Sequence, residues 1–136
     1  MLKIFVNCAG GGTSSLFCSK IEKYANCLGK KTQTCFVLDY INDTRKSKPV
    51  EKTDLLLAYG GTQFILSAEK AGYIEDLKKF DLVWVCPQTR FFYKQAQQIC
   101  EGYSIPCELV EMNMFGKMDG QKAFGYLNSY FGGALS

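Results

Sequence analysis

Residues 4–15, IFVNCAGGGTSS, run from apolar side chains through a single cysteine, Cys8, into three glycines and three hydroxyl side chains. The apolar run from Leu2 to Val6 contains β-branched residues and predicts a short strand. From Ser14 onward, apolar residues recur at helical spacing until Gly29, where a helix C-cap is expected. The sequence therefore predicts a strand, a glycine-rich loop and a helix in direct succession.

The remainder of the chain continues this alternation. Strands are predicted over 34–38, 81–86 and 106–112, and helices after Pro87 and from about Gln121. Thr89 is expected to cap the helix that follows Pro87. Strands separated by helices favour an α/β fold with a small open parallel sheet of about four strands and helices on both faces.

The stretch from Tyr40 to Phe80 is long for one crossover, and we interpret it as an insertion between the second and third strands of one domain spanning residues 1–136. Its apolar run at 55–59, LLLAY, fits either an additional strand or the start of a helix, because periodicity cannot decide at that length. Residues 62–79 are predicted to be mostly helical, with an interruption near Gly72.

Composition restricts the chemistry. The formal charge of +3 is spread along the chain, which argues against nucleic-acid binding, and the basic cluster at 45–48 is interpreted as a solvated loop. The absence of a long apolar run and of a secretory leader favours a cytoplasmic protein. The seven cysteines form no C-x-x-C pair and indicate free thiols rather than disulfides or a zinc site. The chain has no histidine, so no Cys-His couple is available to activate a nucleophile.

The glycine loop indicates an anion site centred on Cys8. In a parallel sheet, ligands gather where strand ends meet helix N-termini. Glycines let successive N–H groups point at one centre, and a helix N-terminus adds partial positive charge. A thiol there is expected to be acidified toward thiolate, and the same N–H groups can hold phosphoryl oxygens. The alternative is a purely structural role, in which the cysteine is buried beside a turn. For the other six cysteines we prefer a structural role as small buried side chains. Cys86 ends a strand on the same edge, so a redox pair with Cys8 also stays open.

Two known loops differ from this one. A Walker A loop requires a lysine that the sequence lacks, which argues against nucleotide hydrolysis. Low-molecular-weight tyrosine phosphatases have an arginine six residues after their cysteine, whereas this sequence has Ser14 there. Without a guanidinium, the loop suits passing on a phosphoryl group better than hydrolysing a phosphate ester.

Three separated motifs resemble those of IIB components of the bacterial phosphoenolpyruvate:sugar phosphotransferase system, of the lactose/cellobiose/chitobiose type. The first is the phosphocysteine loop, CAGGGTSS at 8–15; the second is a strand ending in Pro-Gln, DLVWVCPQ at 81–88; the third is FGKMDG at 115–120. The sequence departs from the usual pattern at Gly12, where methionine is frequent, and at Phe115, where tyrosine is usual.

The resemblance implies a P-loop-containing three-layer sandwich of the phosphatase-like or flavodoxin-like kind, and a phosphoryl relay. A IIA protein carrying phosphohistidine would phosphorylate Cys8, and a sugar such as cellobiose, lactose or chitobiose would receive the group during uptake through a IIC membrane transporter. No metal, nucleotide or other cofactor is required, and the protein would meet the membrane only through IIC. The loop that would bind the phosphoryl group consists of Ala9, Gly10, Gly11, Gly12, Thr13, Ser14 and Ser15. Gln88 and Thr89 are expected as partner contacts.

The residues alone leave two other classes of function open. One is a phosphatase-like or thiol-redox enzyme on the same fold, which turnover of a phosphate ester or a disulfide would support. The other is a flavodoxin-like binding module that holds FMN on the Thr-Ser-Ser turn, which a yellow protein would support.

Overall fold

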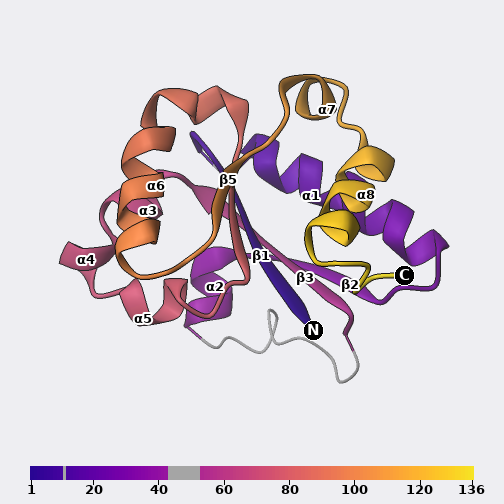
Figure 1. Cartoon of the computed structure of the whole chain (residues 1–136), viewed down its shortest axis with the longest axis horizontal. Coiled ribbons are helices and arrows are strands. Elements are labelled where there is room, and N and C mark those ends of the chain that lie inside the picture. The colour runs from indigo at the N-terminus through magenta and orange to yellow at the C-terminus, as the bar shows by residue number, and fades with distance from the viewer. Residues whose placement is uncertain (11, 43–52) are drawn as a thin grey trace.

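The fold alternates strands and helices along the chain (Figure 1). The computed structural model describes residues 1–10, 12–42 and 53–136. The basic cluster at 45–48 lies outside these residues. The elements are β1 (Leu2–Cys8), α1 (Gly12–Cys27), β2 (Thr32–Phe36), α2 (Val37–Ile41), β3 (Leu55–Gly61), α3 (Gln63–Leu66), α4 (Ala68–Ala71), α5 (Ile74–Leu77), β4 (Leu82–Val85), the 3₁₀ helix η1 (Pro87–Phe92), α6 (Tyr93–Gly102), β5 (Cys107–Leu109), α7 (Met112–Gly116) and α8 (Gly120–Tyr130).

The sheet is parallel, with strand order β2-β3-β1-β4-β5. β1 lies at its centre and pairs with β3 from Leu2 opposite Leu55 to Cys8 opposite Gly61. On its other side β1 pairs with β4, with Asn7 opposite Val85. Because the strands point the same way, their carboxyl ends gather at one edge of the sheet.

Helices cover both faces, so the predicted three-layer architecture is confirmed. α1 and α8 lie on one side of the sheet, and α3, α4, α5 and α6 on the other (Figure 1). Side chains alternate across β1: Ile4 and Val6 join the cluster under α1 and α8, whereas Phe5 joins the cluster under α3 to α6. This period of two is the geometry of a strand buried on both faces.

The sheet has five strands rather than about four, because the run at 55–59 forms the additional strand β3. β3 lies between β2 and β1, and its first four residues, Leu55 to Ala58, are fully buried. Its two faces are both covered, which explains why its sequence lacks an apolar-polar alternation. Of the stretch from 40 to 80, residues 43–52 lie outside the described residues, and whether the stretch is an insertion stays a prediction.

Most predicted boundaries shift by a few residues. β2 begins at Thr32, and Val37 starts α2 instead of continuing the strand. The helical segment after β3 consists of three short helices, α3 to α5, and Gly72 ends α4 in the left-handed region at φ +81°, which confirms the predicted interruption. β5 is shorter than predicted, because Met112 begins α7.

The last helix is fixed against the first. Asp119 caps α8, because its Oδ1 accepts from the backbone N–H of Lys122 at 3.0 Å. Gly120 lies so close to α1 that a Cβ at this position would be 2.2 Å from the carbonyl oxygen of Lys20. Only glycine permits this approach of α8 to α1.

Candidate functional site

Cys8 is the last residue of β1 and lies at the carboxyl edge of the sheet, as predicted. Its side chain is 1% exposed. The backbone N–H of Ser14, the third residue of α1, donates to Sγ of Cys8 with an N to S distance of 3.3 Å. The thiol therefore contacts the N-terminal turn of α1 directly.

This contact favours negative charge on the sulfur. The first N–H groups of a helix have no carbonyl partner within the helix, and they carry the positive end of its dipole. An N–H that donates to sulfur stabilises thiolate more than thiol, because hydrogen bonds to charged acceptors are the stronger ones. The arrangement suits a sulfur nucleophile or a bound anion.

The other predicted loop residues differ in exposure and in their contacts. Ala9, Gly10 and Gly12 are exposed, whereas Gly11 lies outside the described residues. Among the hydroxyl residues, Ser15 Oγ donates to the carbonyl of Gly12 at 3.0 Å. Their predicted role in binding a phosphoryl group stays a prediction.

Ser14 joins the loop to the neighbouring strand. Its side chain is fully buried, and its Oγ donates to the carbonyl of Gly60 in β3 at 3.5 Å. Its backbone N–H donates to Sγ of Cys8, as described above. Thr13, one residue earlier, is half-buried.

The two predicted partner contacts differ in exposure. Gln88 is exposed, and its role as a contact stays a prediction. Thr89 is 4% exposed, so it is not a surface residue, and its Oγ1 lies 2.8 Å from Oγ1 of Thr62 and 3.2 Å from the carbonyl oxygen of Cys86. Thr89 also caps no helix: the N-cap positions of η1 and α6 are Cys86 and Phe92, and neither forms a side-chain capping bond.

Sequence reasoning missed two buried polar residues at this edge, Asn7 and Thr62. The hydroxyl of Thr62 donates to Oδ1 of Asn7 at 2.8 Å, and the backbone N–H of Thr62 donates to the carbonyl of Cys8 at 2.8 Å. A signal for Asn7 was present, because an amide side chain interrupts an otherwise apolar strand directly before the cysteine. Thr62 had no such signal, since its place depends on the pairing of β3 with β1.

The other cysteines occupy less suitable places. Cys18, Cys35, Cys86, Cys100 and Cys107 are buried, as preferred from the sequence, whereas Cys27 at the end of α1 is exposed. Burial raises the pKa of Cys86 well above its usual range, and negative charge at the neighbouring Cys8 raises it further. Burial likewise raises the pKa of Cys18. A redox pair of Cys8 and Cys86 stays a prediction.

The third sequence motif has a structural role. Phe115 packs against Phe17 of α1, with ring centroids 5.2 Å apart. Asp119 and Gly120 form the cap and the close helix contact described above, so the carboxylate of Asp119 is engaged at the start of α8. Asp119 is therefore a helix-capping residue in this structure.

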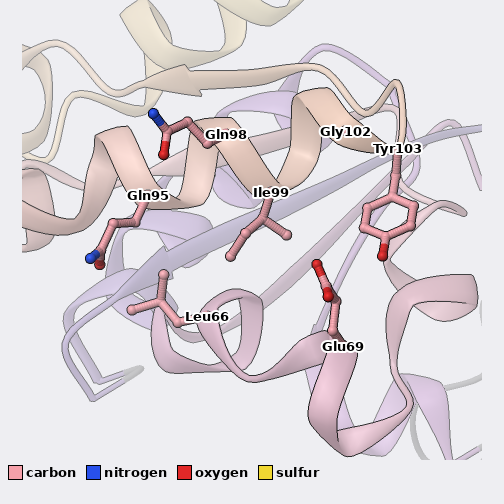
Figure 2. Close-up of a pocket in the computed structure, with 7 residues that line it drawn as sticks. All are labelled: Leu66, Glu69, Gln95, Gln98, Ile99, Gly102 and Tyr103. Carbon is pink, nitrogen blue, oxygen red and sulfur yellow. The ribbon is translucent and has the colours of Figure 1, made fainter.

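A separate cavity of about 650 Å³ lies between α3 and α4 on one side and α6 on the other (Figure 2). Leu66 and Glu69 line the first side, and Gln95, Gln98 and Ile99 line the second. None of its lining residues belongs to the Cys8 loop.

No helix among the described residues has both the length and the apolar character that a membrane span requires.

Comparison with known proteins finds a curated relative and solved structures that resemble this chain. No protein-family model matches the chain. The chain is 25% identical over 124 residues to the PTS system oligo-beta-mannoside-specific EIIB component of Bacillus subtilis (strain 168), which covers 91% of this chain and 90% of the relative.

The solved structures share the fold. The lactose-specific IIB component domain of the phosphotransferase system from Streptococcus pneumoniae superposes with a TM-score of 0.60 at 18% identity, covering 96% of this chain and 97% of that structure. The cellobiose-specific phosphotransferase IIB component from Borrelia burgdorferi gives a TM-score of 0.57 at 21% identity, with 96% and 91% covered. The resemblance to IIB components predicted from the three sequence motifs is thereby confirmed.

Proposed function

We propose that this chain is a phosphoryl carrier of a sugar phosphotransferase system, a IIB component whose acceptor is Cys8. In the first step Sγ of Cys8 attacks the phosphorus of a phosphohistidine on a IIA protein. The S–P bond forms, the P–N bond breaks, and the imidazole of the IIA protein leaves. In the second step a sugar hydroxyl attacks the same phosphorus and gives up its proton to solvent, an O–P bond forms, the S–P bond breaks, and the Cys8 thiolate is regenerated.

One observation carries this proposal: the N–H of Ser14 donates to Sγ of Cys8 at 3.3 Å. The same N-terminal turn that favours thiolate before transfer is placed to face phosphoryl oxygens afterwards, since both states are anionic. The resemblance to IIB components supports the assignment, because it extends over 91% of the chain.

The loop supports a carrier rather than a phosphatase. A phosphatase needs a charged group on the equatorial oxygens, a general acid for the leaving group and an activated water. Ser14 lies six residues after Cys8 at the place of the arginine of low-molecular-weight phosphatases, and its Oγ is directed to Gly60. The chain has no histidine, and Asp119 caps α8. A slow loss of the phosphoryl group to water is what a carrier requires.

IIB components work with a IIA donor and a IIC transporter. For this chain, the sugar we propose is a disaccharide such as cellobiose, lactose or chitobiose. This proposal is supported by the specificities of the similar proteins, which are oligo-beta-mannoside, lactose and cellobiose. The exposed Gln88, which follows β4 at the same edge as Cys8, is proposed as a contact for the partners.

The test is a labelling experiment. The protein is incubated with phosphoenolpyruvate, the general phosphotransferase proteins and a panel of IIA proteins, and the phosphorylated residue is located by mass spectrometry. We expect the phosphoryl group on Cys8 with one IIA protein of the panel. Label on another residue, with none on Cys8, would contradict the assignment.

A steady-state assay separates carrier from phosphatase. We expect negligible turnover of para-nitrophenyl phosphate, and a phosphocysteine that persists for minutes without an acceptor. Turnover at roughly 1 per second or faster, an ordinary enzymatic rate, would replace the carrier assignment with the phosphatase one.

A further inference from the structure

Three buried polar side chains lie beneath the Cys8 loop and connect the carboxyl ends of three strands. They are Asn7 in β1, Thr62 directly after β3 and Thr89 in η1, and each is at most 4% exposed. Among the described residues, the buried polar side chains are these three, Ser14 and Thr53. All except Thr53 therefore belong to the edge of the sheet at which Cys8 lies.

The donors and acceptors of this group match. Nδ2 of Asn7 donates to the carbonyls of Phe5 and Trp84, at 3.4 and 3.2 Å, which leaves Oδ1 as an acceptor. The hydroxyl of Thr62 supplies the proton to this Oδ1 at 2.8 Å. Since a hydroxyl has one proton, Thr62 then accepts in its 2.8 Å contact with Oγ1 of Thr89, and Thr89 gives its proton to Thr62 in preference to the carbonyl oxygen of Cys86, which lies farther away at 3.2 Å.

Thr62 is the member of this group that reaches Cys8. Its backbone N–H donates to the carbonyl oxygen of Cys8 at 2.8 Å, and its Oγ1 lies 3.4 Å from the same oxygen. The Cα of Cys8 carries both this carbonyl and the side chain. A fixed carbonyl therefore limits the backbone rotation that would swing Sγ away from the N–H of Ser14.

We propose that Thr62 is a positioning residue for phosphoryl transfer, which holds the Cys8 peptide so that Sγ stays against the N-terminal turn of α1. This inference rests on the proposed function of Cys8 as the phosphoryl acceptor. Thr62 does not touch the reacting atoms. It acts through the backbone of Cys8, and its hydroxyl bond to Asn7 fixes Thr62 itself relative to β1.

The test compares two substitutions at one position. Thr62→Val keeps the backbone N–H and nearly the same shape, but it removes the hydroxyl and leaves Oδ1 of Asn7 without its donor. Thr62→Ser keeps the hydroxyl. We expect Thr62→Val to slow phosphoryl transfer from phosphorylated IIA by on the order of tenfold, because small misplacements of a reacting group are costly. Thr62→Ser should stay within about twofold of the parent rate.

A matched control comes from β2. Oγ1 of Thr34 is also buried in the sheet, and it has no hydrogen-bond partner among the described residues. Thr34→Val therefore removes a hydroxyl of the same kind without removing a bond, and it should leave the transfer rate unchanged. The melting temperature of every variant is measured, and rates are compared well below the lowest one.

A second readout reports the geometry directly. Amide hydrogen exchange of Ser14, followed by NMR, should be faster in Thr62→Val and unchanged in Thr62→Ser and Thr34→Val, since its N–H donates to Cys8. If Thr62→Val only lowers the melting temperature, with transfer rate and Ser14 exchange unchanged, the positioning role is wrong. If Thr62→Val does not fold, Thr89→Val replaces it: we expect a transfer loss of about threefold, and an unchanged rate would overturn the proposal.

The two proposals fail in different ways. If the unmodified protein accepts no phosphoryl group at Cys8, the proposed function fails and the role of Thr62 falls with it. If the unmodified protein is labelled and Thr62→Val is labelled at the same rate, only the role of Thr62 is overturned.

Discussion

β1 and β4 are neighbours in the sheet; β1 ends at Cys8, β4 is followed directly by Cys86, and both cysteines are buried at the same edge. After Cys8 the chain enters the glycine loop and α1, whose Ser14 N–H returns to the sulfur. After Cys86 the chain continues into Pro87, which has no N–H, and a 3₁₀ helix. The two cysteines therefore occupy equivalent positions at strand ends but differ in their surroundings. The segment that follows each cysteine decides whether its sulfur has an N–H donor that stabilises a negative charge.

The electrostatic contrast follows from this difference. Burial raises the pKa of Cys86, and a negative charge on Cys8 raises it further, so Cys86 stays a neutral thiol when Cys8 is ionised. The two sulfurs are almost equally inaccessible, at 1% and 0% exposed. Differences in their reactivity thus report their surroundings rather than their exposure.

The largest expected effect is on labelling. Cys8→Ser should fold and accept no phosphoryl group from phosphorylated IIA, because a serine hydroxyl is far less acidic than a thiol and the chain offers no histidine as a base. Cys86→Ser should be labelled like the parent protein. Mass spectrometry of the labelled peptides measures both. Retained labelling in Cys8→Ser, or its loss in a folded Cys86→Ser, would reverse the roles of the two cysteines.

The next effect concerns the N–H that distinguishes the two connections. Ser14→Pro removes this donor, whose N–H lies in the first turn of α1 and has no carbonyl partner within the helix. We expect a decrease of the transfer rate by about a hundredfold, in the range found when one preorganised donor to a charged transition state is removed. Ser14→Ala keeps the N–H and loses only the bond from Oγ to Gly60, so it is the control. Equal rates in the two folded variants would show that the N–H has no role.

A smaller effect is expected in alkylation. Iodoacetamide reacts with thiolate, so it should modify Cys8 at lower pH than Cys86 in the folded protein. The raised pKa of Cys86 predicts that this thiol stays unmodified in the folded protein at pH values at which all cysteines of an unfolded control are modified. Peptide mapping at a series of pH values gives the order. Modification of Cys86 before Cys8 would contradict the electrostatic contrast.

The smallest effect is on the pH dependence of stability. As the pH rises past 9.0, the ordinary pKa of the thiol, the unfolded chain loses the proton of Cys86, whereas the folded chain keeps it. The folded state then binds more protons, so the free energy of unfolding falls with rising pH. Cys86→Ala should make this fall less steep by about 1.4 kcal/mol per pH unit. Urea unfolding at several pH values on either side of the ordinary pKa measures the slope, and an unchanged slope would mean that the thiol ionises in the folded state.

The first connection could be predicted from sequence because its signals are local. The apolar run, the glycines and the helical spacing after Ser14 all lie within one stretch of chain, and they placed Cys8 correctly at a strand end facing a helix N-terminus. The sequence does not decide whether the run that forms β3 is a strand or the start of a helix, because a short apolar run buried on both faces lacks the alternation of apolar and polar residues that marks a strand. The role of Thr62 could not be predicted at all, since it depends on which strands pair and in which register.

The contact of Gly120 with the carbonyl of Lys20 changes the meaning of the Asp-Gly pair as a family signature. In this structure the pair determines how the last helix docks, through the cap of Asp119 and the missing Cβ of Gly120. A protein could keep the pair after losing its cysteine, or lose the pair while a compensating change in α1 preserved transfer. Genome searches that weight this motif would therefore group sequences by helix docking, whereas the loop at Cys8 would sort the working carriers from their inactive descendants.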